Sequence, residues 1–222
     1  MLAIAGGKGG CGKTTTAVGI ARALARRERS PLVVGADTDV PDLRRLVGIP
    51  PQPSTDALPG RTLDRVVHRP ADLPGVAAVP AGTPDRSAAA LGCARQWLGP
   101  VLVDCPPGCD GHAAAPLRAC DRALVVTTDR PQSREDARKT ARLVRKLGAK
   151  LSGTAVRLTG NGTADVNSRG VLPPVVARIP EASSPLSDPR TRNAYAVLAR
   201  ALFEGPDGSG ARRPAGRDSR TG

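Results

Sequence analysis

The sequence predicts a single α/β domain with a mostly parallel central sheet and helices on both faces. Short apolar runs recur along the 222 residues, without the alternation of apolar and polar residues typical of half-exposed strands. Segments with helical periodicity separate these runs, as in repeated strand–helix–strand units. A chain of this length can bury one full core, so we expect one domain over residues 1–204.

The predicted elements alternate along the chain. The apolar runs predict strands at Leu2–Ala5, Leu32–Ala36, Val76–Pro80, Val101–Asp104, Ala123–Thr127, Gly153–Arg157 and Val175–Ile179. Helical periodicity predicts helices at Thr14–Arg29, Arg86–Trp97, Arg134–Leu147 and Thr191–Phe203. The proline-rich segment Ile49–Arg61 predicts an irregular loop, and residues 205–222 predict a disordered basic tail.

A glycine-rich segment directly follows the first predicted strand. Residues 6–16 read GGKGGCGKTTT, and Gly7-x-x-x-x-Gly12-Lys13-Thr14 has the spacing of a P-loop. Glycines let the backbone wrap around phosphates, and the next helix adds the positive end of its dipole. We expect Lys13 to reach the β and γ phosphates and the Thr14 hydroxyl to bind Mg²⁺. The other loop residues expected at the nucleotide are Gly7, Lys8, Gly9, Gly10, Cys11, Gly12 and Thr15.

A second lysine, Lys8, stands inside this loop. The run from Lys8 to Thr14, KGGCGKT, resembles the deviant Walker A motif of the MinD/ParA ATPases, which are related to Mrp, CooC and the nitrogenase iron protein. The resemblance covers residues 1–204 and implies a P-loop NTPase fold and an ATP-driven homodimer. In that dimer Lys8 would contact the partner's nucleotide and stabilise charge on the transferred phosphoryl group. It also implies slow ATP hydrolysis, stimulated by an unknown protein partner, in intracellular positioning or partitioning.

An aspartate-rich segment follows the second predicted strand. Residues 33–43, VVGADTDVPDL, resemble the switch I segment of the same family. The resemblance implies that Asp37 positions the attacking water and lies near Mg²⁺, with Asp39 as a secondary candidate. The chain departs from the pattern at Gly35, where many relatives have aspartate.

Another aspartate ends the fourth predicted strand. The segment Asp104–Gly108, DCPPG, resembles the Walker B and switch II region of the family. An acidic residue at this place can hold Mg²⁺ directly or through water, which assigns Asp104 to the metal. The backbone of Gly108 can approach the γ-phosphate closely, so we expect it to respond to ATP.

The residues that would contact the base depart further from the family. Relatives often place an asparagine that reads adenine at the end of the strand Gly153–Arg157, where this chain has Arg157. Either Arg157 stacks on the base, or Asn161 replaces the missing asparagine. Pro180 belongs to a segment that resembles the family's loop beside adenine. ATP rather than GTP is therefore implied by the resemblance.

The formal charge of +13 favours anionic partners. Arg138, Arg142 and Arg145 recur on one side of a predicted helix, and the tail carries further arginines. Two interpretations stay open: a solvated face, or contact with DNA or another anionic surface. Binding to DNA through these arginines would be led by phosphates and would weaken steeply with salt.

The lengths of the apolar runs and the spacing of the cysteines bear on the location of the protein and on its possible metal chemistry. No run of about 18 apolar residues occurs, so we expect no transmembrane segment. We also expect no signal peptide and a cytoplasmic location, which fits five cysteines without a C-x-x-C pair. Cys105 and Cys109 leave a metal or iron–sulfur cofactor maturation ATPase as an alternative. A nucleotide-gated DNA-binding module with negligible hydrolysis is the other alternative.

Overall fold

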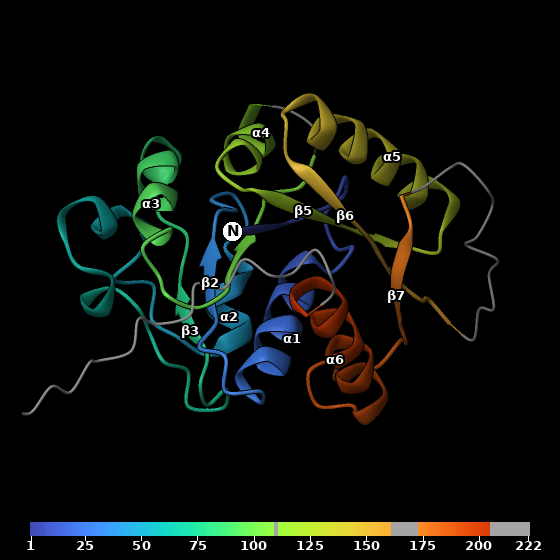
Figure 1. The fold of residues 1–222 in the computed structure, drawn as a ribbon, viewed down its shortest axis with the longest axis horizontal. Coiled ribbons are helices and arrows are strands. Elements are labelled where there is room, and N and C mark those ends of the chain that lie inside the picture. Colours follow the sequence, from blue (N-terminus) through green and yellow to red (C-terminus); the bar gives the residue numbers. More distant parts are fainter. Residues whose placement is uncertain (109–110, 161–172, 205–222) are drawn as a thin grey trace, which may run out of the picture.

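Seven parallel strands form one sheet through the middle of the protein (Figure 1). The computed structural model describes residues 1–108, 111–160 and 173–204. The strand order is β3-β2-β4-β1-β5-β6-β7. The strands are β1 Leu2–Ala5, β2 Leu32–Gly35, β3 Ala77–Val79, β4 Val101–Asp104, β5 Arg122–Thr128, β6 Lys150–Arg157 and β7 Val175–Ile179. Every predicted strand is therefore present, within a few residues of its predicted bounds.

The largest difference among the strands concerns the start of β6. The sequence predicts this strand from Gly153, whereas it begins at Lys150, opposite Arg122 of β5. The register shifts beyond Ala123, and Gly153 has a φ of 126° there, a conformation that glycine adopts readily. Lys150 and Ser152 before this glycine are polar, so the apolar pattern did not predict the first part of the strand.

The helices differ more from the prediction. They are α1 Lys13–Ala25, α2 Asp42–Val47, α3 Ser87–Ala94, α4 Gly111–Arg118, α5 Pro131–Lys146 and α6 Pro189–Phe203. Helices α2 and α4 were not predicted, because α2 has only six residues and α4 contains Pro116. The predicted loop Ile49–Arg61 contains a 3₁₀ helix at Thr55–Gly60, so that prediction was wrong for these residues.

The helices cover both faces of the sheet, as the sequence predicts. Leu2 and Ile4 of β1 belong to the core that contacts α1, α2 and α6. Ala3 and Ala5 point to the other face, into the core with α3 and α4. This alternation buries β1 on both sides, and the loop that follows it lies at the carboxyl edge of the sheet, where α/β proteins bind ligands.

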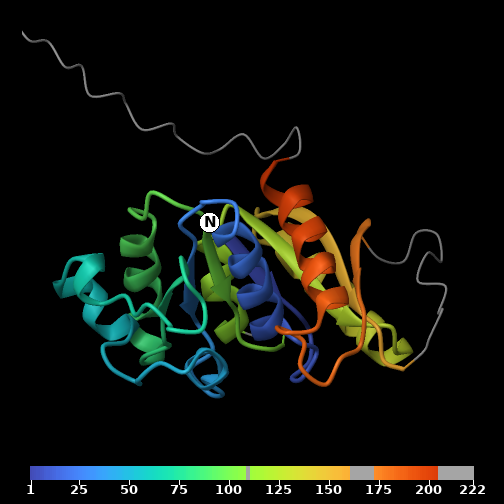
Figure 2. The ribbon, with the colours of Figure 1, turned by 90° about the horizontal axis from the view of Figure 1, so that it is seen from below.

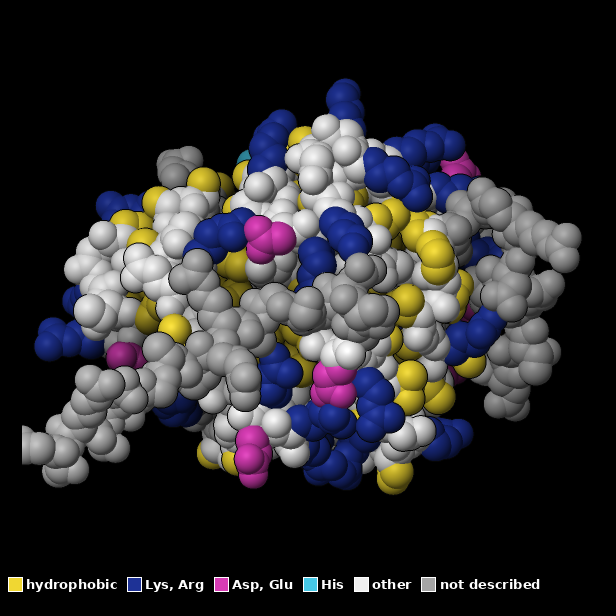
Figure 3. Space-filling model, viewed as in Figure 1, with side chains coloured by type: hydrophobic (Ala, Val, Ile, Leu, Met, Phe, Trp, Pro, Cys, Tyr) yellow, Lys and Arg dark blue, Asp and Glu magenta, His cyan; other side chains and the backbone are white. Residues whose placement is uncertain are grey.

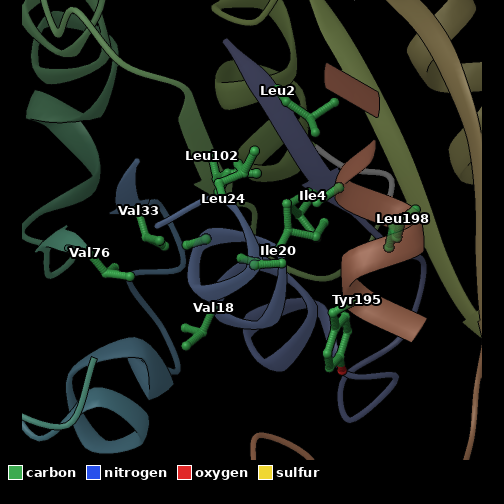
Figure 4. Packing of buried hydrophobic residues seen from close by; sticks show 14 of the residues in the cluster. Leu2, Ile4, Val18, Ile20, Leu24, Val33, Val76, Leu102, Tyr195 and Leu198 are labelled. Atoms are coloured by element: carbon green, nitrogen blue, oxygen red, sulfur yellow. The ribbon is translucent and has the colours of Figure 1, made fainter. Parts of the chain in front are cut away.

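Helices α1 and α6 lie side by side over the first face (Figures 1 and 2). Figure 4 shows Tyr195 and Leu198 of α6 beside Ile20 of α1. A Cβ on Gly19 would lie 2.5 Å from the Tyr195 ring, so glycine permits the close contact of these helices. On the other face, the Trp97 indole Nε1 donates a hydrogen bond of 2.7 Å to the carbonyl of Ser30, just before β2.

Candidate nucleotide site

The loop between β1 and α1 has the backbone shape of an anion cradle. Gly10 and Gly12 have φ angles of 78° and 94°, which glycine adopts without strain. A Cβ on Gly9 or Gly10 would meet no atom within 4 Å, so this side of the loop borders open space. No side chain caps the start of α1 at Gly12. The first N–H groups of α1 therefore remain available to an anion.

Lys13 begins α1 and is buried, with 6% of its surface exposed. It forms no salt bridge within the described part of the chain, although its charge lowers the pKa of the neighbouring Asp104. A buried ammonium group without an ion pair is costly. An anion in the cradle would supply the charge that this lysine lacks.

Asp104 ends β4, which pairs with β1 so that Asp104 lies opposite Ile4. Its side chain is buried, and Oδ1 has no hydrogen-bond partner among residues 1–108, 111–160 and 173–204. Burial is the largest influence and raises the pKa of Asp104 to about 7. Hydrogen bonding from the Thr14 side chain and the charge of Lys13 lower it, whereas the charge of Asp37 raises it.

These groups suit Mg²⁺. The Thr14 hydroxyl and the carboxylates of Asp104 and Asp37 are hard oxygen donors, which Mg²⁺ prefers. Asp37 follows β2, the neighbour of β4, and its Oδ1 accepts a hydrogen bond of 3.0 Å from the Val40 N–H. The buried Oδ1 of Asp104 is an unused acceptor at the same place. The donor set therefore fits the metal that the sequence implies.

Other predicted residues lie at the rim of this site. Lys8 and Asp39 are exposed, and Thr15 is half-buried in the first turn of α1. The Cys11 thiol is buried, and burial raises its pKa. Gly108 has a φ of 101° and lies four residues beyond Asp104. The chain thus brings Lys13, Thr14, Asp37 and Asp104 to one edge of the sheet, with Lys8 facing solvent.

Arg157 joins the end of β6 to the P-loop. Its Nη1 donates a hydrogen bond of 3.5 Å to the carbonyl of Gly10. A Cβ on Gly12 would lie 2.5 Å from the Arg157 Cδ, so the side chain crosses directly beside the loop. Pro180 lies farther along the same edge, at the end of β7, and Asn161 lies outside the described residues.

Polar residues beside Arg157 are already hydrogen-bonded to one another. Asp129 Oδ1 accepts from the Thr159 hydroxyl at 2.7 Å, and the Thr159 N–H also donates to this carboxylate. Glu181 accepts from the Gly160 N–H, which ties the ends of β6 and β7 together. Asp129 was not predicted as a site residue, although it directly follows β5, much as Asp37 lies just beyond β2 and Asp104 ends β4.

Cys105 directly follows Asp104 in the chain, and helix α5 contacts the P-loop, since a Cβ on Gly7 would lie 2.6 Å from the Asp136 Cβ. Cys105 is buried, and burial raises its pKa well above the ordinary value, whereas Cys109 lies outside the described residues. In the part of the chain that is described, no group of three or more His, Cys, Asp or Glu residues is arranged to hold a metal. Arg142 and Arg145 of α5 are exposed, and Arg138 is half-buried. None of the described helices is both long enough and apolar enough for a membrane span.

Known sequences resemble most of this chain. An uncharacterised ATP-binding protein of Methanocaldococcus jannaschii is 27% identical over 223 aligned positions, which cover 93% of this chain and 81% of that protein. The septum site-determining protein MinD of Synechocystis is 26% identical over 150 positions, which cover 62% of this chain and 56% of that protein. The match thus spans little more than half the length of that second relative.

The fold has a similar relative among solved structures. MinD of Pyrococcus horikoshii, solved in complex with Mg-ADP, matches with a TM-score of 0.78 at 21% identity, over 90% of this chain and 94% of that one. A sequence profile of the CobQ/CobB/MinD/ParA nucleotide binding domain matches residues 2–173, which is most of the chain. The chain belongs to the CobQ/CobB/MinD/ParA nucleotide-binding domain family.

Proposed function

We propose that this chain is a Mg²⁺-dependent ATPase whose ATP-bound form is a homodimer and acts as a molecular switch. The observation that carries this proposal is that Lys13 and an Asp104 oxygen are both buried beside an open glycine cradle, the first without an ion pair and the second without a hydrogen bond among the described residues. Both groups would gain their missing interactions from a Mg²⁺-bound polyphosphate. The relatives described as ATP-binding and as a Mg-ADP complex support the choice of ligand.

In this proposal each residue of the site has a separate role in phosphoryl transfer. Lys13 and the loop N–H groups hold the phosphates, while Thr14 and Asp104 would hold Mg²⁺, which neutralises phosphate charge. Asp37 orients the attacking water, and Lys8 enters the partner's site, as its exposure allows. The backbone of Gly108 approaches the γ-phosphate, so the loop after β4 responds to the presence of this group. Catalysis is then positioning and charge neutralisation, with a stimulating protein partner setting the rate.

Titration calorimetry tests the ligand. The chain should bind ATP and ADP with Mg²⁺ present, and EDTA should weaken ATP binding. Lys13→Ala should abolish the signal without lowering the thermal unfolding temperature, because it removes a buried charge that has no ion pair. An absence of adenine nucleotide binding by the folded wild-type chain would overturn the proposal.

The unit that performs this function is proposed to be residues 1–204. A role in intracellular positioning or partitioning, and a cytoplasmic location, are proposed on the same family resemblance. The tail beyond residue 204 lies outside the described residues and is not assigned a part in the switch.

A second candidate function is nucleotide-gated binding to DNA with negligible hydrolysis. The exposed Arg142 and Arg145 on α5 favour it, since both guanidinium groups are accessible to phosphates. Phosphate release should be measured with and without duplex DNA at two salt concentrations. DNA that binds at low salt and leaves hydrolysis undetectable in all conditions would favour this candidate over the switch. Cofactor maturation has less support, because Cys105 is buried.

A further inference from the structure

A pocket of about 130 Å³ lies between α1 and α6, away from the P-loop. Its basic lining comes from both helices, and Leu186 and Tyr195 contribute apolar surface. The arginines that line it are Arg22, Arg26, Arg27 and Arg192. Figure 3 shows basic side chains gathered at the lower edge of the face where α1 and α6 lie in Figure 1.

The pocket is separate from the nucleotide site. Arg22 and Arg26 follow Lys13 by 9 and 13 residues along α1. At about 1.5 Å per residue, these positions are roughly 14 and 20 Å from Lys13 along the helix axis. A ligand small enough for this pocket therefore cannot also contact the start of α1.

The positive charge in the pocket is only partly balanced. Arg27 Nε forms an ion pair of 2.6 Å with Glu204, and Arg22 donates to the carbonyl of Leu186. Arg26 and Arg192 form no ion pair with any described carboxylate, and none of the described lining residues is acidic. Desolvation lowers the pKa of Arg22, and the charges of Arg192 and Arg26 lower it further. The guanidinium group of Arg22 is thus close enough to Arg26 and Arg192 to be repelled by each of them.

Helix dipoles explain only part of this cluster. Arg22 and Arg26 lie at the carboxyl end of α1, where a cation is favoured. Arg192 instead lies near the amino end of α6, where a cation is disfavoured. Its charge also acts unfavourably on Arg22 of α1, whose pKa it lowers. An external anion would relieve both of these unfavourable interactions.

We propose that this pocket binds a phosphoryl group through Arg22, Arg26 and Arg192, either as inorganic phosphate or as the head of a phosphomonoester. The planar guanidinium fork matches two phosphate oxygens at once, and several forks can share one phosphoryl group. A concave pocket of this volume admits a single phosphoryl group, whereas a nucleic acid duplex requires a broad surface. Leu186 and Tyr195 add apolar surface to the pocket, beside which the organic part of a phosphomonoester can lie.

Calorimetry on the full-length chain tests this proposal, with inorganic phosphate and phenyl phosphate as separate probes. We expect one saturable site for at least one probe. The double variant Arg26→Gln/Arg192→Gln should weaken binding by about tenfold or more, since two charge-assisted contacts are lost. The control Arg142→Gln/Arg145→Gln removes the same charge from α5 and should change the affinity by less than about twofold.

The two probes identify the source of the phosphoryl group. Tighter binding of phenyl phosphate indicates a phosphomonoester whose organic part lies on the apolar wall, and equal affinity indicates inorganic phosphate. Lys13→Ala should leave this binding intact, which separates the pocket from the P-loop and from the proposed ATPase. The proposal fails if neither probe saturates, if the α5 control weakens binding as much as the pocket variant, or if Lys13→Ala abolishes it. Duplex DNA that binds through these arginines when neither probe saturates would assign the surface to nucleic acid instead.

Discussion

At the residue scale, the site combines a cation and an acid that are both buried without full partners. The charged forms of Lys13 and Asp104 would each have a lower free energy in water or beside a ligand. These two buried groups therefore lower the free energy of unfolding of the ligand-free chain, and ligand binding would offset this cost. The sequence indicates both residues as candidates, because Lys13 lies in the P-loop motif and Asp104 ends a strand beside it, but it could not predict how deeply they are buried.

The first prediction concerns Asp104→Asn without nucleotide or Mg²⁺. The folded-state pKa of Asp104 is raised to about 7 from 3.8, so the charged form destabilises the fold. The contribution of this carboxyl to the free energy of unfolding is most favourable below pH 4 and falls as the pH rises to 7, by about 1.4 kcal/mol per unit. Urea unfolding should therefore show that the free energy of unfolding of Asp104→Asn increases relative to that of the wild type between pH 4 and 7. Above pH 7 the difference between the two free energies should stay constant. A gap that does not change with pH would contradict this.

The second prediction concerns Arg157, which crosses from β6 to the P-loop beside Gly12. Arg157→Ala should weaken Mg-ADP and Mg-ATP binding alike, by roughly tenfold, since the contact does not require a γ-phosphate. Arg142→Ala, on α5, is the control and should bind both nucleotides normally. Calorimetry gives the two affinities. A loss limited to ATP would show that Arg157 acts on the γ-phosphate instead.

At the element scale, periodicity predicted the strands better than the helices. Strands buried on both faces leave long apolar runs that are easy to recognise, as in β1 and β4. Helix α2 is short and begins at the end of the aspartate-rich segment 33–43, and α4 mixes small residues with Pro116. Both helices bury apolar residues in the core, α2 beside α1 and α4 beside α3 and β1, and this packing adds to a weak local preference for helix. The sequence alone therefore could not predict them.

The third prediction tests the packing of α1 against α6. Gly19→Ala would place a methyl group 2.5 Å from the Tyr195 ring, so we expect a loss of about 1–3 kcal/mol in the free energy of unfolding. Gly92→Ala is the matched control, because it lies in α3 with no atom within 4 Å of the added Cβ. That control should raise stability by about 0.5–1 kcal/mol through helix propensity. Equal effects at both positions would show that the helices separate easily.

At the scale of the whole molecule, the parallel sheet gathers groups that are far apart in sequence. The P-loop and Asp37 follow β1 and β2, whereas Asp104 and Arg157 end β4 and β6, and all four strands end at one edge of the sheet. The motif spacing predicted this convergence because parallel strands present their carboxyl ends together. The hydrogen bonds from Thr159 to Asp129 and from the Gly160 N–H to Glu181 were not predictable, since they depend on loop conformation.

The fourth prediction concerns assembly. Asp37→Ala should form a dimer that persists with Mg-ATP, because hydrolysis no longer releases it. Lys8→Ala should bind Mg-ATP and stay monomeric, since the exposed lysine would no longer reach a partner's phosphates. Size-exclusion chromatography with light scattering distinguishes these states, with Arg142→Ala as a control. A monomeric wild type at saturating Mg-ATP, with binding confirmed, would refute ATP-driven dimerisation while leaving nucleotide binding intact.

The hydrogen bond from Trp97 to the Ser30 carbonyl has a practical consequence for such measurements. The chain has one tryptophan, so emission excited at its red edge comes from a single fluorophore. This hydrogen bond holds the Trp97 side chain where the chain enters β2, whereas the P-loop lies at the opposite, carboxyl edge of the sheet. Intrinsic fluorescence will thus follow denaturation of the α3 side without a direct optical response to nucleotide, and an extrinsic dye is needed to watch binding.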